Sequence, residues 1–291
     1  MSGAPRFSIL LPTHNRPEVL RHAIASVLAQ DFTDFELLVV GDGCTDGTAD
    51  LVQGFDDPRI RWFDRPKGPG FGYANRNHAL AEARGEVIGF LGHDNLLFAD
   101  HLDLFDRAFR DPQLHFVHSL PLWIRDDGLI APSFANLRIP PVRRNFMKHY
   151  NVLPATCVMH RRSCFDAVGM WPTDLERGGD YELWKRILDH YPHRAVGYLR
   201  QPTCLHFRAD WRDPQRWAPP PVAYLGAIHD AGRFWPPALA LPLEGAETPQ
   251  AGAWRILRDG GPGWLAELRG AVALLRDMLA HHAGLDGNFA L

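Results

Sequence analysis

One stretch of the chain reads Gly85-Glu86-Val87-Ile88-Gly89-Phe90-Leu91-Gly92-His93-Asp94-Asn95. Its first part is a short apolar run typical of a buried strand, and its end brings together an imidazole, a carboxylate and an amide. In open α/β sheets, ligands bind at the carboxyl ends of the strands. A carboxylate there can hold a hard cation, and the cation can hold a diphosphate. The alternative is an ordinary strand-to-helix turn, in which Gly, Asp and Asn are common.

The surrounding segments alternate between strand and helix patterns. Strands are predicted at residues 7–11, 36–40, 59–63 and 86–91, and helices at 17–30, 48–54, 73–83 and 99–110. Short connections between alternating strands and helices favour a parallel, doubly wound sheet. The strands are continuously apolar, as expected when helices cover both faces of the sheet. We therefore expect an α/β fold.

Three polar loops follow three of these strands, at residues 13–16, 42–48 and 93–95. Because the carboxyl ends of parallel strands meet at one sheet edge, the loops together predict a pocket. The Gly41-Asp42-Gly43 loop lacks the third glycine of the dinucleotide fingerprint, and there is no G-x-x-x-x-G-K-[ST] motif. A nucleotide in this pocket would therefore not bind as in a Rossmann dehydrogenase or a P-loop ATPase.

The second half has a less regular pattern. Residues 114–124, 155–160, 194–199 and 202–207 predict strands, and residues 131–150, rich in Pro, Arg and Asn, predict a mobile loop over the site. Asp180 lies at or near the N-cap of a predicted helix. Asp is a favoured cap, which is the structural explanation, and a helix N-terminus also lowers the pKa of a carboxylate.

From Trp211 onward, Pro-rich segments separate helical patches at 222–234, 252–258 and 264–282. We expect residues 1–210 to form one domain, with a nucleotide-sugar half at about 1–110 and an acceptor and catalytic half at about 111–210. Residues 211–291 form a helical, Pro-rich extension. It is expected to pack on the core or to serve as an interface for a homo-oligomer.

Composition narrows the classes of partner. The formal net charge is −3, so no nucleic acid partner is expected. No two of the four cysteines form a C-x-x-C pair, which favours reduced thiols over a zinc or redox site. The N-terminus lacks the apolar region of a signal peptide, and no apolar stretch is long enough to span a bilayer. We expect a cytoplasmic protein that can act peripherally at a membrane.

Five segments, in this order, resemble the motifs of a family 2 glycosyltransferase with the GT-A fold. They are Leu11-Pro12-Thr13-His14-Asn15-Arg16, residues 36–48, Asn75-Arg76-Asn77, residues 85–95, and Gly179-Asp180-Tyr181-Glu182-Leu183-Trp184. The resemblance covers roughly residues 6–207. It implies a Rossmann-like, mostly parallel, doubly wound sheet and a hexosyltransferase-like enzyme.

The resemblance also implies roles for individual residues. Thr13 and Asp42 match contacts to the nucleobase and ribose, and Arg76 matches a position near the nucleotide end of the pocket. Asp180 matches the base of inverting members. The metal position, for Mg²⁺ or Mn²⁺, is Asp94, the last Asp of a D-x-D motif, with His206 as a candidate ligand against a structural or acceptor role. The whole set expected to bind the nucleotide sugar is Pro12, Thr13, Asn15, Arg16, Asp42, Arg76, Asn77, His93 and Asp94.

Three positions depart from the family pattern. Gly92 replaces the first Asp of the D-x-D motif, Gly41 replaces a common Asp after the second strand, and Gly179 replaces the Glu of a Glu-Asp pair. One carboxylate, Asp94, remains for the metal, which is acceptable for Mg²⁺ with diphosphate and water as further ligands. His93 is expected to be a loop residue or sugar contact.

The expected function is inverting, metal-assisted transfer of a sugar from a nucleotide diphosphate sugar, with a UDP-sugar as the expected donor. The acceptor is a hydroxyl of a glycan, a glycolipid or a small molecule, and residues 131–150 and the extension are expected to select it. One alternative is a non-catalytic nucleotide-sugar-binding protein, suggested by Gly41 and Gly92. A sugar nucleotidyltransferase is less well supported, because residues 12–16 lack the glycines of a triphosphate loop.

Overall fold

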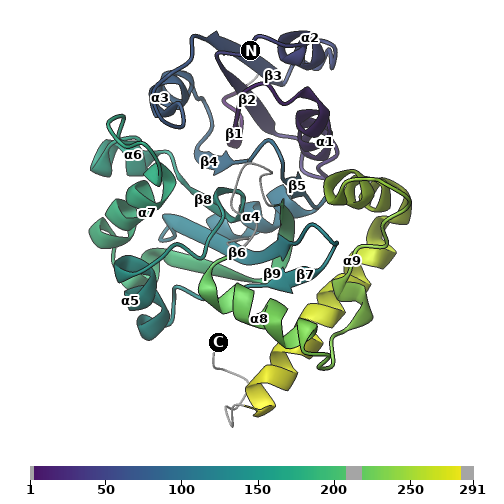
Figure 1. Ribbon diagram of the computed structural model, residues 1–291. Helices are drawn as coiled ribbons and strands as arrows, with labels where there is room; N and C mark the ends of the chain where they lie inside the picture. Colours follow the sequence, from purple (N-terminus) through teal and green to yellow (C-terminus); the bar gives the residue numbers. More distant parts are fainter. Residues whose placement is uncertain (1–2, 208–217, 283–291) are drawn as a thin grey trace.

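The computed structural model describes residues 3–207 and 218–282. Within these residues the strands form one nine-stranded sheet of order β3-β2-β1-β4-β8-β6-β9-β5, and β7 pairs with β6 (Figure 1). Neighbours in β3-β2-β1-β4 are parallel, whereas β8 is antiparallel to both β4 and β6. The predicted α/β class is confirmed.

The first half alternates strand and helix as its sequence predicts. The strands are β1 (Phe7–Thr13), β2 (Phe35–Asp42), β3 (Ile60–Arg65), β4 (Val87–Phe90) and the two-residue β5 (Leu96–Leu97). The helices are α1 (Pro17–Leu28), α2 (Thr48–Gln53), α3 (Tyr73–Ala81) and α4 (His101–Phe109). Only β5 has no counterpart among the predicted elements, because two residues carry no periodicity.

The second half contains β6 (Phe116–Ile124), β7 (Ile130–Pro132), β8 (Val158–Arg161) and β9 (Val196–Phe207). Its helices are α5 (Pro140–Lys148), α6 (Ser163–Val168) and α7 (Gly179–His190). The two strands predicted at 194–199 and 202–207 are one strand, β9, which runs parallel to β6 with register shifts along their length.

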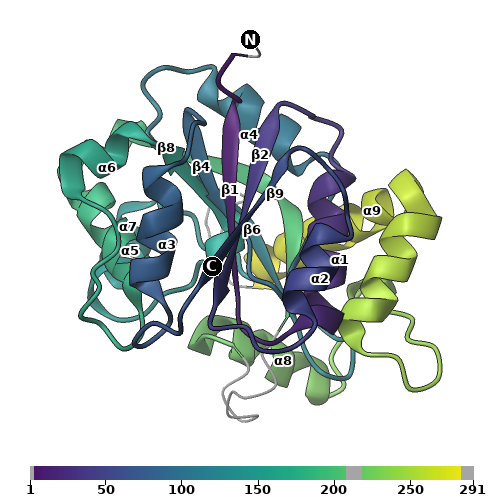
Figure 2. The same cartoon turned by 90° about the horizontal axis from the view of Figure 1, so that it is seen from above.

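Helices cover both faces of the sheet, as Figure 2 shows: α3, α5, α6 and α7 lie on one side, and α1, α2 and α9 on the other. The strands have side chains in both layers because successive residues point to opposite faces. In β1, Leu10 packs in the cluster with α3 and α7, while Ile9 and Leu11 pack in the cluster with α1 and α4.

The prediction of a mobile loop at residues 131–150 is wrong. This segment contains the end of β7 and the helix α5, which begins with Pro140 in the first turn, where proline is tolerated. Phe146 is buried and packs edge-on against Tyr181 of α7, with 5.1 Å between ring centroids. A single buried anchor therefore orders a helix that composition alone does not reveal.

The C-terminal part comprises α8 (Pro220–Asp230) and α9 (Pro249–His282). Gly261, with φ 51° and ψ −147°, interrupts α9 just before Pro262. The second part of α9 buries Leu268, Val272 and Leu275 in a third apolar cluster with side chains of β6 and β9. The extension thus packs on the core, as predicted. The homo-oligomer and the domain boundary at residue 210 stay predictions. Residues 211–217 and 283–291 of the extension lie outside the described residues.

Two further predictions concern thiols and membranes. All four cysteines are free, and the Sγ atoms of buried Cys157 and Cys204 lie 3.3 Å apart. Within the described ranges, no helix has both the length and the apolar character needed to cross a lipid bilayer.

Candidate functional site

A cavity of about 750 Å³ lies at the carboxyl ends of β1, β2 and β4. All three polar sequence regions reach it, through Thr13, Asp42 and His93 among others. It is closed on the other side by the segment after α5, the start of α7 and the end of β9. Predicted site residues in its lining are Pro12, Thr13, Arg16, Asp42, Arg76, His93, Asp94, Asp180 and His206.

Asp42 ends β2 and is held by three donors. Its carboxylate accepts hydrogen bonds from Gly68 N and Asn75 Nδ2, both at 2.7 Å, and forms an ion pair with Lys67. Burial raises the pKa of Asp42, but these three partners outweigh burial and hold the pKa below its ordinary value. Asp42 is therefore an ionised, rigid acceptor on the cavity wall.

Four buried donor groups on residues of the cavity lining have no hydrogen-bond partner among the described residues. They are Thr13 Oγ1, Arg76 Nε, Trp123 Nε1 and Trp171 Nε1. Buried polar atoms in folded proteins are nearly always paired, so each unpaired one requires an explanation. A polar ligand in the cavity would offer these groups hydrogen-bond partners.

Asp180 lies in the first turn of α7, and α3 fixes its position. Its Oδ1 is 3.5 Å from Arg76 Nη1, and the Arg76 guanidinium lies over the rings of Tyr73 and Trp171, at 5.0 and 5.7 Å. The Tyr73 hydroxyl accepts a hydrogen bond from Gly179 N at 2.8 Å. These contacts fix where the Asp180 carboxylate lies in the cavity.

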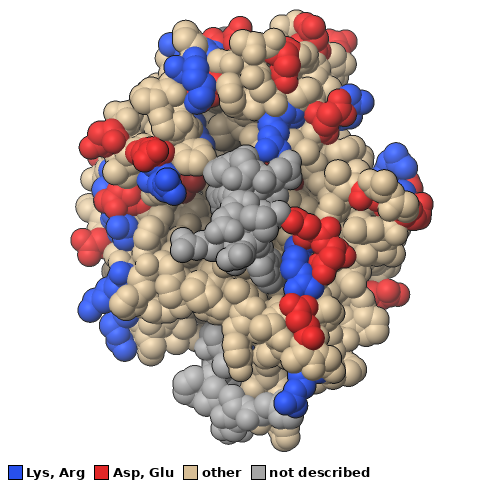
Figure 3. All heavy atoms as spheres, viewed as in Figure 1, with Lys and Arg blue, Asp and Glu red and all other residues tan. Residues whose placement is uncertain are grey.

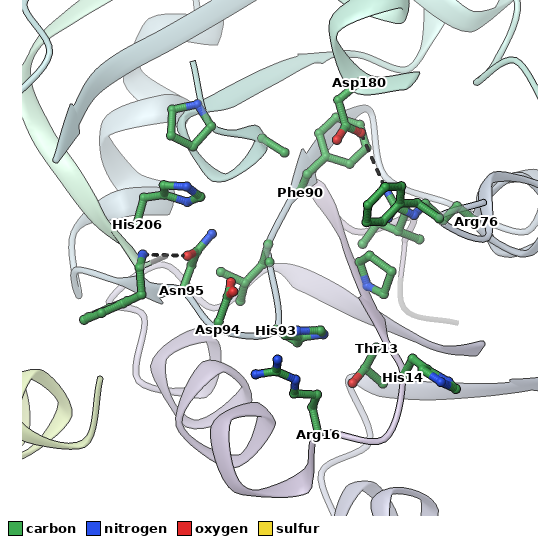
Figure 4. Close-up of a pocket in the computed structure, with 18 of the residues that line it drawn as sticks. Thr13, His14, Arg16, Arg76, Phe90, His93, Asp94, Asn95, Asp180 and His206 are labelled. Carbon is green, nitrogen blue, oxygen red and sulfur yellow. Dashed lines mark hydrogen bonds and ion pairs between the residues drawn. The ribbon is translucent and has the colours of Figure 1, made fainter. Parts of the chain in front are cut away.

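Asp94 and Asp180 lie on opposite sides of the cavity in Figure 4, with Arg16 and His93 beside Asp94. His93 is partly buried, and burial lowers the pKa of its imidazole, which favours the neutral ring. His206 comes from β9 and packs edge-on against Trp123, with 4.4 Å between ring centroids. The cavity thus has carboxylates at both ends of its length.

Asn15 and Asn77 are the predicted site residues that lie outside the cavity lining. Asn15, with φ 48°, accepts a hydrogen bond from Thr45 N at 2.8 Å and so joins two of the polar loops. Asn77 donates to Trp171 O at 2.8 Å and accepts from Trp171 N at 3.2 Å. Each holds a loop that lines the cavity.

Several lining residues have no signal in the sequence, among them Lys67, Phe71, Trp123, Asn151 and Trp171. Lys67 directly precedes the Gly68-Pro69-Gly70 loop, and a lone cation beside such a loop is the one pattern that could have indicated it. The sequence pattern predicts that the tryptophans are core residues. Apolar periodicity does not distinguish a ring in the core from a ring that lines a cavity.

Neighbouring side chains fill the space at all three glycines that replace family acids. A Cβ at Gly92 would lie 2.6 Å from Asn95 Nδ2, and one at Gly179 would lie 2.6 Å from Tyr73 Cε1. A Cβ at Gly41 would overlap the ring of Trp62. Real Cβ atoms do not approach other atoms so closely. The packing around these three glycines therefore leaves no room for the acidic side chains of the family pattern.

Asp94 and His206, the two predicted metal ligands, both line the cavity. Asn95, next to Asp94, already uses its side chain in hydrogen bonds within the protein. Asn95 Nδ2 donates to Thr156 Oγ1 at 2.7 Å, and its Oδ1 accepts from Phe207 N at 3.1 Å. Nowhere in residues 3–207 and 218–282 do three His, Cys, Asp or Glu side chains form a group that could hold a metal ion. The residues therefore fit Mg²⁺ or Mn²⁺ only when a diphosphate and water complete its coordination.

Comparison with known proteins shows the family and the fold of the chain. Residues 8–169 match the family model described as glycosyl transferase family 2. A Campylobacter jejuni protein, GalNAc(5)-diNAcBac-PP-undecaprenol beta-1,3-glucosyltransferase, is 38% identical over 137 residues, which are 45% of this chain and 42% of that protein. The chain thus spans less than half of the length of this relative.

Two solved structures share the fold. S. aureus TarS 1–349 in complex with UDP-GlcNAc superposes with a TM-score of 0.56 at 16% identity, covering 72% of this chain and 61% of the TarS 1–349 chain. The mannosyltransferase PcManGT from Pyrobaculum calidifontis, in complex with GDP-Man and Mn²⁺, gives a TM-score of 0.54 at 18% identity and covers 96% of this chain and 80% of that one. With more than half of its sequence matched by the family model, the chain belongs to glycosyl transferase family 2.

Proposed function

We propose that this protein transfers a sugar from a nucleotide diphosphate sugar to an acceptor hydroxyl, with inversion at the anomeric carbon. The observation that carries the proposal is the cavity in which Asp180 faces Asp94 across the space and four buried donors lack partners within the described part of the chain. Family membership supports the reaction class.

Inversion requires a base on the side of the sugar opposite the leaving group. Asp180 takes the proton of the acceptor hydroxyl while that oxygen attacks the anomeric carbon, and the bond to the diphosphate breaks. The ion pair with Arg76 holds the Asp180 carboxylate in position. The segment after α5, which includes Asn151 and Leu153, forms the wall on the acceptor side.

The donor binds at the other end, where Asp42 and Thr13 take the nucleoside and Arg16 and His93 lie toward the diphosphate. A UDP-sugar is the proposed donor, because the structurally similar TarS is described in complex with UDP-GlcNAc. The proposed acceptor is a lipid-linked glycan, as the name of the Campylobacter relative states for that protein.

Asp94 is the proposed protein ligand of Mg²⁺ or Mn²⁺, with His206 as a second candidate. The bound cation supplies Lewis-acid neutralisation of the charge on the leaving diphosphate. We predict that Asp94→Ala removes the Mn²⁺ dependence of UDP binding, which titration calorimetry with and without Mn²⁺ measures. His206→Gln is expected to reduce that dependence only in part. An unchanged Mn²⁺ dependence in Asp94→Ala contradicts the assignment.

The decisive experiment compares Asp180→Asn with Glu182→Gln in the same helical turn. Glu182 pairs with Lys185 and is not part of the cavity lining, so it is a matched control for charge loss. Asp180→Asn should keep donor binding and lose at least about 100-fold in transfer rate, the scale of general-base catalysis. The control should retain activity. Equal turnover in Asp180→Asn refutes Asp180 as the base.

The alternative of a non-catalytic binding protein is favoured by the three filled glycine positions. The same assay separates the two functions. A non-catalytic protein binds UDP-sugars tightly but gives neither transfer nor slow donor hydrolysis, and Asp180→Asn then changes nothing.

A further inference from the structure

Residues 128–165 contain no Asp or Glu, although the whole chain has a formal net charge of −3. The same stretch contains six basic residues, which are Arg138, Arg143, Arg144, Lys148, Arg161 and Arg162. Arg161 is neutralised by an ion pair with Glu86. The acid-free segment therefore concentrates its positive charge on and around α5.

A groove of about 340 Å³ lies between α5 and the end of α7, apart from the large cavity. Its lining includes Arg143, Arg144, Met147 and Lys148 of α5, and Asp189 and His193 from the α7 side. Arg144 and Lys148 are exposed and form no ion pair with any other described residue. Asp189 is the single carboxylate, so the groove has an excess of cations.

Arg143 links the groove to the fold. Its Nη2 donates to the carbonyl oxygen of Leu188 near the end of α7, whereas its buried Nη1 has no hydrogen-bond partner among residues 3–207 and 218–282. A buried donor without a partner is costly, and an anion in the groove would satisfy it. This unpartnered Nη1 of Arg143 distinguishes the groove from an ordinary solvated basic surface.

We propose that this groove binds the phosphate headgroup of an anionic lipid and holds the protein at a membrane surface. Lys and Arg side chains gather at the lower left of Figure 3, where Figure 1 places α5. Clustered Lys and Arg residues are attracted to anionic leaflets, and Met147 and Pro140 add an apolar rim to the groove.

The position of α5 gives such binding a direct connection to the site. Asn151, Leu153 and Pro154 follow α5 in the chain and line the large cavity. Helix α5 also contacts α7, because the Tyr181 hydroxyl donates a hydrogen bond to the carbonyl oxygen of Phe146. Tyr181 directly follows Asp180 in the chain. A membrane at α5 would therefore lie next to the wall assigned above to the acceptor.

Vesicle sedimentation with the full chain tests the proposal without any donor. Vesicles of phosphatidylcholine with phosphatidylglycerol should bind the protein, and vesicles of phosphatidylcholine alone should not. The double variant Arg144→Gln, Lys148→Gln should weaken binding about 30-fold, since each basic residue near an anionic surface contributes about a factor of five. Both residues are exposed, so the melting temperature should hold and exclude unfolding as the cause.

The matched control removes the same charge elsewhere, with Arg107→Gln and Arg258→Gln, two exposed residues that pair with Asp103 and Asp259. It should leave binding within about twofold, because charges beyond the screening length contribute little. Equal binding to both kinds of vesicle, or an equal loss in the control, overturns the proposal.

A second arm separates the lipid from free phosphate. Inorganic phosphate at millimolar concentration should compete only weakly with the vesicles. Stabilisation of the protein by inorganic phosphate in a thermal-shift assay, lost in the double variant and with no vesicle binding, would identify a free-phosphate site and overturn the lipid assignment.

Discussion

The two halves of the cavity are built in different ways. On the donor side, Thr13, Asp42 and Asp94 each lie at or just after the end of a parallel strand, so the sheet itself brings them together. Among the site residues from the second half of the chain, Asp180 starts a helix, and His206 lies near the end of a strand that pairs with β6 and β5. The first arrangement follows from strand order, and the second depends on contacts between distant segments.

One helix of the donor half provides most of those contacts. Tyr73, Arg76 and Asn77 of α3 bind Gly179 N, the Asp180 carboxylate and the backbone of Trp171, respectively. The proposed base is thus positioned by the half of the molecule that is proposed to hold the nucleotide. The proposed donor and acceptor sides are therefore joined through α3.

The largest expected effect is a loss of folding stability at acidic pH, and it arises in the second half of the chain. Buried His118 in β6 lies with Nδ1 3.2 Å from Ser119 O, and its Nε2 accepts a hydrogen bond from Leu137 N at 3.2 Å. A ring in this arrangement is neutral, and burial lowers the pKa of His118 to about 4 from an ordinary 6.5. Between these values the unfolded chain binds a proton that the folded chain does not.

Stability contributed by neutral His118 is therefore fully present above pH 6.5 and is lost as the pH falls toward 4. At about 1.4 kcal/mol per pH unit, the loss reaches about 3 kcal/mol. Urea unfolding from pH 7 to pH 4.5 should give a shallower pH dependence for His118→Gln than for the unaltered chain. His190→Gln, at an exposed position, is the control and should leave the slope unchanged. Identical slopes in all three proteins would contradict the prediction.

The second test concerns the contact between α3 and the start of α7. It replaces Gly179 with the Glu of the family pattern. Gly179→Glu places a Cβ against the ring of Tyr73, so the free energy of unfolding should fall by about 2 kcal/mol. Thermal and urea denaturation measure it. In a double-mutant cycle, the cost of Gly179→Glu should shrink when Tyr73 is replaced by Ala, because the overlap is gone. An additive cycle would show that the two residues are not coupled.

The smallest change, Tyr73→Phe, removes one hydroxyl from the same junction. Gly179 N then loses its acceptor, which should cost about 1 kcal/mol of unfolding free energy. Since α7 carries the proposed base, kcat should fall while KM for the donor stays nearly constant. Tyr181→Phe, on the face of α7 that packs against α5, is a control for loss of a hydroxyl. A rise in donor KM with unchanged kcat would place the role of Tyr73 on the donor side instead.

The same contrast explains what could be predicted from the sequence. Apolar runs followed by polar loops identified β1, β2 and β4 and the residues at their ends, because periodicity and strand order suffice there. The motif around Asp180 indicated a helix start, but its placement across from Asp94 depends on Tyr73 and Arg76, which no local pattern connects to it. Helix α5 was missed for the same reason, since its anchor Phe146 finds its partner Tyr181 in another helix.

The break in α9 at Gly261 has a consequence for how the chain can be divided. Beyond the break, α9 covers the β9 side of the sheet: it supplies Leu268 to the apolar cluster, and Arg269 forms a two-pronged ion pair with Asp100 next to α4. A fragment that ends near residue 210 would leave the apolar side chains Leu120 and Leu205 without this cover. Uncovered apolar surface promotes aggregation. Expression of a fragment that ends near residue 210 would therefore require α9 to be supplied as a separate chain.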